Sequence, residues 1–478
     1  MKIQLFRPPL NNWYDSGNIN SDLVSVPSEL LLVAINRLKW VRDHDLKILD
    51  GMGCDIKKVK KKINADVVGV TSLYVNYENA LEILRTAKEK GAKTVIGGPH
   101  TTAMYERILK NRSFVDYVVV GDGSKTFEMI VDGCAEEEIP NLAFRRDGEI
   151  VKNKREYDSI HGFCNLDFIK DLTESILSEK IRLLHSKLSE KKRLSHSMSL
   201  KKIADPRNEL LISKKYRGKA IPIAFTRGCS KADLEGRCAH CSIDGKYREI
   251  YIKVFGWDSI CNYCYFGSNK YFETGDSPTL EFLEEFLEHR PNDLKDVQFR
   301  FYGNFEYITP RYAEVLKELN TFELFLGLES VNDQILANIG KQHRREDIEK
   351  GIDVLTEKGI FLHLPFMYGL PGETEETARE SYEFAKGLVE KGHNLMIMSS
   401  HAIPLPGSKL FNDLLKNEKA VLEYPGNLLN DDILDYKELV KLNLKYSTKI
   451  DYDFAKEMIR KTKALTPNNQ TTSLGINE

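Results

Sequence analysis

The chain has 478 residues, with 69 Lys and Arg against 71 Asp and Glu, and a formal net charge of −2 at pH 7. That length allows two to three domains, and the balanced charge with 41% hydrophobic residues is typical of a soluble globular enzyme. The sequence has no apolar run of the ~18 residues that a membrane helix needs, and its first residues resemble a strand rather than a signal peptide.

The first part of the chain alternates apolar segments with helical patterns. Residues 65–72, 94–100 and 115–123 each read as a strand that ends in small residues, and residues 79–90 and 102–109 have helical periodicity. This alternation predicts a parallel, doubly wound sheet, whose ligands lie beyond the carboxyl ends of the strands. A hairpin around Asp147-Gly148 closes this α/β unit, which we place at residues 1–155.

The next segment, residues 156–218, differs in composition. It is rich in Lys, Arg, Ser and Leu, and residues 172–194 have helical periodicity. We interpret it as a helical connector with a basic, solvated face rather than a nucleic-acid-binding surface, so nucleic acid is an unlikely partner.

A cysteine-rich loop follows a short apolar strand. The strand leads into Phe225-Thr-Arg-Gly-Cys229, and Cys238-Ala-His240-Cys241 comes next. Thiolates bind zinc, copper(I) or iron–sulfur clusters, and a structural zinc site normally needs a fourth protein ligand. Three thiolates leave one iron of a [4Fe–4S] cluster open. Five of the eight cysteines lie between residues 229 and 264, which indicates a metal site in a reducing cytoplasm rather than a disulfide framework.

Strand and helix patterns alternate over residues 219–415, after the connector. Strands are expected at 221–225, 297–302, 323–328, 360–367 and 394–400. Three short motifs lie in this region, Gly327-Leu-Glu329-Ser330, Gly369-Leu-Pro-Gly-Glu-Thr374 and Pro404-Leu-Pro-Gly-Ser408. Residues 416–478 form a C-terminal region that is mainly helical, at 433–445 and 452–463.

The order and spacing of these motifs resemble those of radical S-adenosylmethionine (radical SAM) enzymes that carry an N-terminal cobalamin-binding domain. The resemblance implies a doubly wound, Rossmann-like cobalamin-binding domain followed by a partial (β/α) barrel at residues 219–415. The family's barrel usually has six strands, so one strand is either missing here or supplied by 249–255. It implies a [4Fe–4S] cluster, S-adenosylmethionine and cobalamin as cofactors, with Cys229, Cys238 and Cys241 as the cluster ligands. Eight residues separate the first two cysteines, a longer gap than the family usually has. His240 stands where the family usually has an aromatic residue beside the adenine.

A second cysteine pair, Cys261 and Cys264, leaves three alternatives open. The pair could supply two of the cluster ligands, with Cys229 or Cys241 as the third. It could hold an auxiliary metal, or it could be two inert buried thiols.

The resemblance also implies which residues contact the organic cofactors. S-Adenosylmethionine is expected to contact Gly303 and Asn304 through its amino group, Glu329 and Ser330 through its ribose or aminocarboxylate, and Gly369 through its adenine. The corrin is expected to contact Thr71, Ser72, Leu73 and Tyr74, and its nucleotide tail Gly97, Gly98, Gly121 and Gly123. No Asp-x-His-x-x-Gly motif occurs, so neither His44 nor His100 is expected to bind cobalt. The alternative is a degenerate domain that has lost cobalamin.

The function that the resemblance implies is methyl transfer to an unreactive carbon. The cluster cleaves S-adenosylmethionine, the 5′-deoxyadenosyl radical abstracts a hydrogen, and methylcobalamin supplies the methyl group. The alternatives are a cobalamin-dependent cyclase or rearrangement enzyme, a radical enzyme that modifies RNA, and a non-enzymatic cobalamin sensor. The substrate is a peptide, a protein side chain, a small metabolite or a lipid precursor, and a flavodoxin or ferredoxin is the expected electron donor.

Overall fold

A computed structural model describes residues 1–11, 44–51, 54–157, 221–223, 225–234, 236–243, 248–249, 269–273, 275 and 277–466. Most of the predicted connector and the pair Cys261 and Cys264 lie outside these residues. No helix within them is long and apolar enough to cross a bilayer.

The N-terminal sheet has seven strands in the order β2-β1-β3-β4-β5-β6-β7. Five are parallel, namely β1 (Lys2–Arg7), β2 (Asp45–Asp50), β3 (Val67–Thr71), β4 (Lys93–Gly97) and β5 (Tyr117–Val119). The chain reverses its direction of winding between β1 and β3, and this is where such sheets open a ligand crevice at their carboxyl edge.

The predicted hairpin and the two helical layers are present. Strands β6 (Leu142–Arg146) and β7 (Glu149–Lys152) are antiparallel, and both Asp147 (φ 51°) and Gly148 (φ 85°) have the positive φ that a tight hairpin turn needs. Helices α4 (Tyr77–Glu89) and α5 (Pro99–Asn111) pack on one face of the sheet, and α6 (Ser124–Val131) packs on the other. A short helix, α3 (Ile56–Lys61), follows β2. The doubly wound sheet is therefore confirmed.

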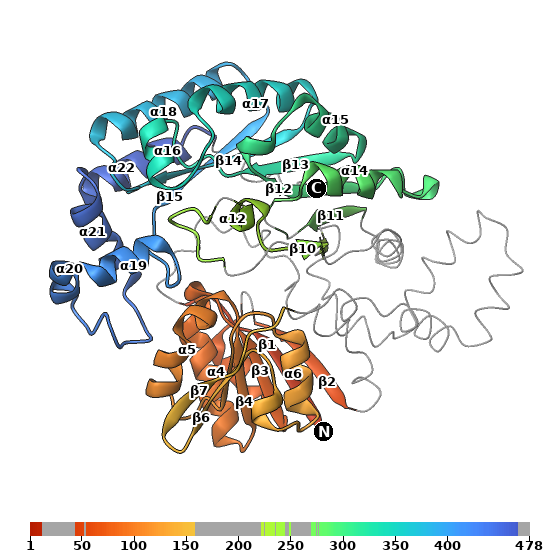
Figure 1. Cartoon of the computed structure of the whole chain (residues 1–478), viewed down its shortest axis with the longest axis vertical. Coiled ribbons are helices and arrows are strands. Elements are labelled where there is room, and N and C mark those ends of the chain that lie inside the picture. Colours follow the sequence, from red (N-terminus) through yellow and green to blue (C-terminus); the bar gives the residue numbers. More distant parts are fainter. Residues whose placement is uncertain are drawn as a thin grey trace, which may run out of the picture.

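The second sheet has six strands in the order β8-β11-β12-β13-β14-β15. They are β8 (Ile221–Ile223), β11 (Lys270–Glu273), β12 (Gln298–Gly303), β13 (Thr321–Leu326), β14 (Phe361–Tyr368) and β15 (Leu395–His401), and every described pairing is parallel. The outer helices are α14 (Leu280–Glu288), α15 (Pro310–Glu318), α16 (Asp333–Asn338), α17 (Arg345–Glu357) and α18 (Glu375–Glu390). Figure 1 shows these helices over the outer side of the sheet.

The sixth strand is neither missing nor supplied by 249–255, so both expectations about it were wrong. It is β11, only four residues long, and it ends in the charged residue Glu273. Glu273 is fully buried, and its carboxylate accepts backbone N–H groups from the residues that follow the neighbouring strand β8, which offsets the cost of burying it. A four-residue strand with charge at both ends carries too little apolar pattern to be recognised in the sequence.

The interior of the barrel contains a group of buried polar side chains. Phe299, Phe301, Leu324, Leu362 and Leu364 pack under the outer helices, so the residues that alternate with them face the interior. Three of these are Arg300, Glu323 and His363, which are all buried. The Glu323 carboxylate lies 2.9 Å from Arg300 Nε and 3.0 Å from His363 Nδ1. Burial lowers the pKa of His363, although Glu323 opposes that shift.

Four C-terminal helices connect the two sheets, namely α19 (Lys409–Lys416), α20 (Glu418–Glu423), α21 (Tyr436–Ser447) and α22 (Tyr452–Lys463). Helix α22 covers β14 and β15, where Thr462 Oγ1 lies 2.7 Å from the Tyr368 hydroxyl. The other three share one hydrophobic cluster with α4 and α5 of the N-terminal sheet. Figure 1 shows α19 to α21 along one side of the molecule, between the barrel and the N-terminal sheet.

Asp432 is the main polar contact between the C-terminal region and the N-terminal sheet. Its buried carboxylate accepts hydrogen bonds from Arg112 Nε at 2.7 Å and from the Tyr77 hydroxyl at 2.6 Å. Burial and the Asp432 charge both raise the pKa of Tyr77, which therefore keeps its proton and donates it. Arg107 adds hydrogen bonds to the carbonyls of Leu428 and Asp431.

We predict that Asp432→Asn destabilises the protein by about 2–3 kcal/mol, because it leaves Arg112 partly buried without its countercharge. Calorimetric unfolding of the full chain measures this. Asp413→Asn is the matched control, since Asp413 forms an exposed ion pair with Lys409 that contributes only about 0–1 kcal/mol. Equal unfolding temperatures for the two variants would contradict the prediction.

Candidate functional site

The cysteine loop is anchored at the carboxyl end of β8. Glu273 Oε1 accepts the backbone N–H groups of Phe225 at 2.9 Å and Thr226 at 3.1 Å, and its Oε2 accepts Gly275 N–H at 2.6 Å. These bonds hold the backbone that leads into Cys229, through β9 (Thr226–Arg227), which pairs with β10 (Arg248–Glu249), and into α12 (Ser230–Leu234). The backbone just before Cys229, the first predicted ligand, is therefore held in one position.

The other end of the loop is held by backbone contacts to the barrel. Cys241 N–H donates to the Cys238 carbonyl at 3.0 Å, and Ala239 N–H donates to the Ile339 carbonyl at 2.9 Å. The Lys231 ammonium, which is buried, donates to the Gly340 carbonyl at 2.7 Å. The loop is thus tied to the end of α16 at two points.

The three predicted cluster ligands are thiols, the ligand type that iron–sulfur clusters take. Cys229, Cys238 and Cys241 are all half-buried. Burial raises the pKa of Cys238, Lys341 and Lys231 act to lower it, and the charge of Cys229 is close enough to raise it. Cys241 Sγ accepts Ile243 N–H at 3.4 Å, a contact that suits a thiolate ligand. Within the described ranges, no three His, Cys, Asp or Glu side chains are already arranged as a metal site, so the ligand set stays a prediction.

Glu329 lies beside this loop in a strained conformation. Its φ is 62°, which is rare for a residue with a side chain, and it is held there by two backbone hydrogen bonds. Glu329 N–H donates to the Pro365 carbonyl and Met367 N–H donates to the Glu329 carbonyl, both at 2.9 Å. This bridge to β14 aims the carboxylate at the cysteine loop.

The Glu329 carboxylate is buried and only partly paired. Its Oε1 lies 3.4 Å from Lys341 Nζ and 3.7 Å from His240 Nε2, while its Oε2 has no hydrogen-bond partner. Burial acts to lower the pKa of Lys341, but the nearby Glu329 carboxylate acts to raise it, and the pKa lies above its usual value. Burial lowers the pKa of His240 against the opposing effect of Glu329. An unpaired buried carboxylate oxygen next to the cysteine loop is suited to a hydrogen-bond donor on a cofactor.

The end of β12 contributes a second carboxylate that the sequence prediction did not include. Glu306 accepts Gln342 N–H at 2.8 Å and Asn304 Nδ2 at 3.1 Å, and lies 3.5 Å from His343 Nδ1. Burial alone would raise the pKa of Glu306, but the His343 and Gln342 hydrogen bonds lower it to about 2. The sequence could have indicated Glu306, because it lies two residues after the predicted Gly303-Asn304 pair. Lys341 carried no comparable signal, since it is an isolated lysine after a short helix.

Ser330 and Gly369 have defined structural contacts. The Ser330 hydroxyl lies 3.4 Å from Ser381 Oγ and accepts Asn332 N–H, so it supports the start of α16. Gly369 has a φ of 99° and its N–H donates to Glu373 Oε2 at 2.5 Å. Burial raises the pKa of Glu373 to about 8. The cofactor contacts of Ser330, Gly369 and Gly303 stay predictions.

The predicted cobalamin residues gather at the carboxyl edge of the N-terminal sheet. Thr71 ends β3 and Ser72, Leu73 and Tyr74 follow it, Gly97 ends β4 and Gly98 follows it, and Gly121 and Gly123 come after β5. Gly98 has a φ of 116°, and a Cβ there would lie 2.5 Å from the Ser72 carbonyl oxygen, so only glycine fits. Leu73 is 44% exposed at this edge, where an apolar corrin face could cover it.

Neither candidate histidine is placed as an open cobalt ligand. His44 precedes β2, at the opposite edge of the sheet. His100 is enclosed between the Tyr77 ring, at 4.5 Å between centroids, and the Tyr436 hydroxyl, 3.4 Å from Nδ1. Burial lowers the pKa of His100 to about 4.

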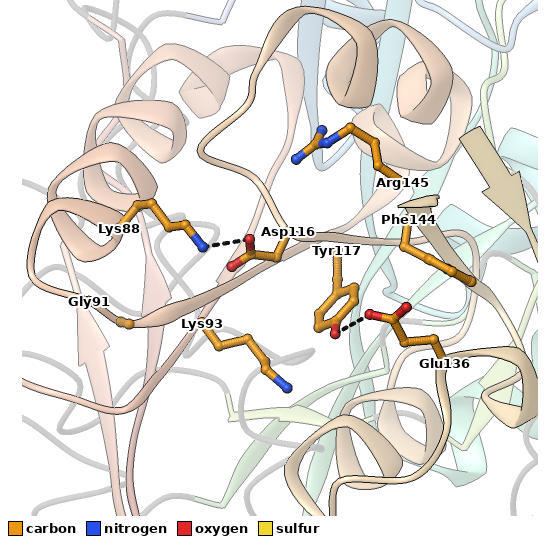
Figure 2. Close-up of a pocket in the computed structure, with 9 residues that line it drawn as sticks. Lys88, Gly91, Lys93, Asp116, Tyr117, Glu136, Phe144 and Arg145 are labelled. Atoms are coloured by element: carbon orange, nitrogen blue, oxygen red, sulfur yellow. Dashed lines mark hydrogen bonds and ion pairs between the residues drawn. The ribbon is translucent and has the colours of Figure 1, made fainter. Parts of the chain in front are cut away.

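A surface pocket of about 390 Å³ lies away from this site. Figure 2 shows that Lys88, Lys93, Asp116, Tyr117 and Glu136 line it, with Lys88 paired to Asp116 and Tyr117 to Glu136. Lys93 begins β4 and Tyr117 begins β5, so the pocket is at the amino edge of the sheet. It is therefore separate from the predicted cofactor edge.

Two family models match the two sheets. The B12 binding domain model matches residues 40–131, and the radical SAM superfamily model matches residues 304–385. The chain is a radical SAM enzyme with a cobalamin-binding domain. Its cofactors are a [4Fe–4S] cluster, S-adenosylmethionine and cobalamin. The second match begins after the cysteine loop, so it does not test the assignment of Cys229, Cys238 and Cys241.

Similar proteins include both methyltransferases and a cyclase. The chain is 24% identical to an uncharacterized methyltransferase of Pyrococcus horikoshii, over 78% of this chain and 76% of that protein. It is 25% identical to the anaerobic magnesium-protoporphyrin IX monomethyl ester cyclase of Rubrivivax gelatinosus, over 77% of this chain and 63% of that protein. The structure of the radical SAM methyltransferase TsrM from Kitasatospora setae, with cobalamin and a [4Fe–4S] cluster bound, has a TM-score of 0.62 at 16% identity. That similarity covers 86% of this chain and 77% of TsrM.

We predict that replacing Cys229, Cys238 and Cys241 together by Ala removes the cluster and abolishes reductive cleavage of S-adenosylmethionine. Iron content and the formation of 5′-deoxyadenosine in the anaerobically prepared radical SAM enzyme measure this. Cys54→Ala with Cys134→Ala, both in the N-terminal sheet region, is the control and should keep its iron. If Cys261→Ala with Cys264→Ala loses activity while the triple variant keeps it, the assignment is wrong.

Glu329→Gln is predicted to weaken S-adenosylmethionine binding about ten- to a hundredfold, because a charge-assisted hydrogen bond contributes about 1.5–3 kcal/mol. Calorimetric titration of the reconstituted enzyme measures this. Iron content and cobalamin retention should not change. Glu346→Gln, on the exposed side of α17, is the control. Unchanged affinity in Glu329→Gln would give Glu329 a purely structural role.

Proposed function

We propose that this radical SAM enzyme transfers a methyl group to an unreactive carbon of its substrate. The observation that carries the proposal is the proximity of the two sites. The carboxyl edge of the N-terminal sheet faces the cysteine loop in Figure 1, and Gly407 lies between the two, because a Cβ added there would be within 4 Å of both Ala103 of α5 and Ser242, next to Cys241. A methyl group held at the first site is then within reach of a carbon radical generated at the second.

The bound cofactors supply the reactive chemistry, a 5′-deoxyadenosyl radical from S-adenosylmethionine and a methyl group from cobalamin. The residues of this chain bind and orient them. Glu329 and the Asn304–Glu306 pair would hold S-adenosylmethionine beside the cysteine loop. The small residues after β3, β4 and β5 admit the corrin to the sheet edge.

The substrate is proposed to enter the barrel interior below these groups. There it meets the Arg300–Glu323–His363 group, in which Glu323 Oε2 and His363 Nε2 have no hydrogen-bond partner. A substrate with polar groups would satisfy them, which is compatible with a peptide, a side chain or a small metabolite. A flavodoxin or ferredoxin is the proposed electron donor.

The second candidate function is ring closure. The similarity to the Rubrivivax cyclase favours it, because that protein is 25% identical to this chain and the Pyrococcus methyltransferase is 24% identical to it. The two reactions differ in their by-products. Methyl transfer consumes one S-adenosylmethionine as methyl donor, which leaves S-adenosylhomocysteine, and a second as radical source, which leaves 5′-deoxyadenosine. Ring closure leaves no S-adenosylhomocysteine.

We predict that the cobalamin-loaded enzyme, given S-adenosylmethionine and a low-potential reductant, releases both S-adenosylhomocysteine and 5′-deoxyadenosine. Mass-spectrometric quantification of the two products measures this without knowledge of the substrate. Enzyme prepared without cobalamin is the control and should release 5′-deoxyadenosine alone. Release of 5′-deoxyadenosine without S-adenosylhomocysteine from the loaded enzyme would favour the cyclase.

A further inference from the structure

A turn near the end of the barrel lies between the two cofactor regions. Gly407 has a φ of 89°, and a Cβ there would lie 3.2 Å from Ala103 Cβ and 3.9 Å from Ser242 Cβ. Ala103 belongs to α5 of the cobalamin-binding domain, and Ser242 directly follows the predicted ligand Cys241. Alanine is therefore disfavoured at position 407 by the left-handed backbone, and its Cβ would also press on Ala103 of α5, while its distance from Ser242 would be an ordinary contact.

The helix that follows the turn contacts both regions with consecutive residues. Ser408 Oγ accepts Phe411 N–H at 3.2 Å and so caps α19. Leu410 N–H donates to the Ala239 carbonyl at 3.0 Å, and its side chain packs with Ala239 and Leu370. Phe411 instead belongs to the hydrophobic cluster of the cobalamin-binding domain, with the Arg107 guanidinium 5.7 Å from its ring centroid.

Helix α21 makes a second connection of the same kind. At its start, Tyr436 lies 4.9 Å from the Tyr74 ring, between centroids, and its hydroxyl lies 3.4 Å from His100 Nδ1. Near its end, Asn443 Nδ2 donates to the Gly369 carbonyl at 2.7 Å, and the Ser447 carbonyl accepts Gly372 N–H at 2.7 Å. Twelve residues of helix span about 18 Å, so α21 reaches from the predicted corrin edge to the turn at the barrel mouth.

We propose that α19 and α21 couple the two cofactor sites, so that cobalamin binding increases the affinity for S-adenosylmethionine. Corrin contact with residues 71–74 and the start of α5 restrains Tyr436 and Gly407. These in turn restrain the Ala239 carbonyl and the turn at Gly369, so less conformational entropy is lost when S-adenosylmethionine binds. Gly407 and Asn443 are positioning residues in this scheme. The inference does not depend on methyl transfer, because it concerns binding alone.

The test is calorimetric titration of S-adenosylmethionine into the full-length, cluster-loaded enzyme with and without cobalamin. The dissociation constant of the unaltered enzyme should fall at least about fivefold when cobalamin is present. Gly407→Ala and Asn443→Leu should each bring this ratio close to one. By thermodynamic reciprocity, S-adenosylmethionine should increase the affinity for cobalamin by the same factor.

Gly392→Ala is the matched control for Gly407→Ala. Gly392 has a φ of 75°, so alanine is strained there too, but nothing lies within 4 Å of the added Cβ. This variant should keep the full ratio. The proposal is wrong if the unaltered enzyme shows equal affinities with and without cobalamin, or if Gly407→Ala and Asn443→Leu both retain its ratio.

Hydrogen exchange of the unaltered enzyme provides a test that does not depend on the folding of any variant. Adding cobalamin without S-adenosylmethionine should slow amide exchange in residues 369–373, through α21. Unchanged exchange there, while residues 71–74 become protected, would overturn the proposal. No turnover is measured in either experiment, so failure of the proposed methyl transfer leaves both results interpretable.

Discussion

Buried carboxylates that accept backbone N–H groups hold the functional end of the barrel in place. Glu273 fixes the backbone before Cys229, Glu306 binds the loop after α16, and Glu373 closes the turn that begins at Gly369. Glu306, whose pKa is lowered to about 2, is ionised and makes the stronger, charge-assisted kind of hydrogen bond, whereas Glu373, whose pKa is raised to about 8, is mostly protonated at neutral pH and accepts as a neutral group. Each of these carboxylates lies at or just beyond the carboxyl end of a strand, where the three loops converge.

Glu329, at the same end of the barrel, has an unfavourable backbone conformation. A non-glycine residue at φ 62° costs about 1–3 kcal/mol unless its surroundings hold it there. Here the bridge to β14 and the buried Lys341 supply that restraint. The result is a carboxylate oxygen without a partner, beside the thiols. A strained backbone and an unpaired buried oxygen both lower the stability of the fold. We therefore attribute these features of Glu329 to cofactor binding.

The C-terminal helices make the two sheets one structural unit. The Arg112–Asp432–Tyr77 contact and the shared apolar cluster attach α19 to α21 to the cobalamin-binding domain, and α22 covers two barrel strands. This arrangement brings the cobalamin edge to the cysteine loop. The proposals on methyl transfer and on coupling both require the predicted cobalamin and S-adenosylmethionine sites to be near one another.

The sequence by itself determined the features that depend on local pattern. Alternating apolar segments and helices predicted the N-terminal parallel sheet, Asp147-Gly148 predicted its hairpin, and short motifs at fixed spacing indicated the cofactors. Only the tertiary structure revealed β11. A strand of four residues has too short a sequence pattern to be predicted, and it is identified by its pairing with β8 and β12. The same holds for Lys341, Glu273 and the partners of His100. Each is defined by contacts between residues far apart in the chain, and the burial that gives these polar groups their chemistry exists only once the chain has folded.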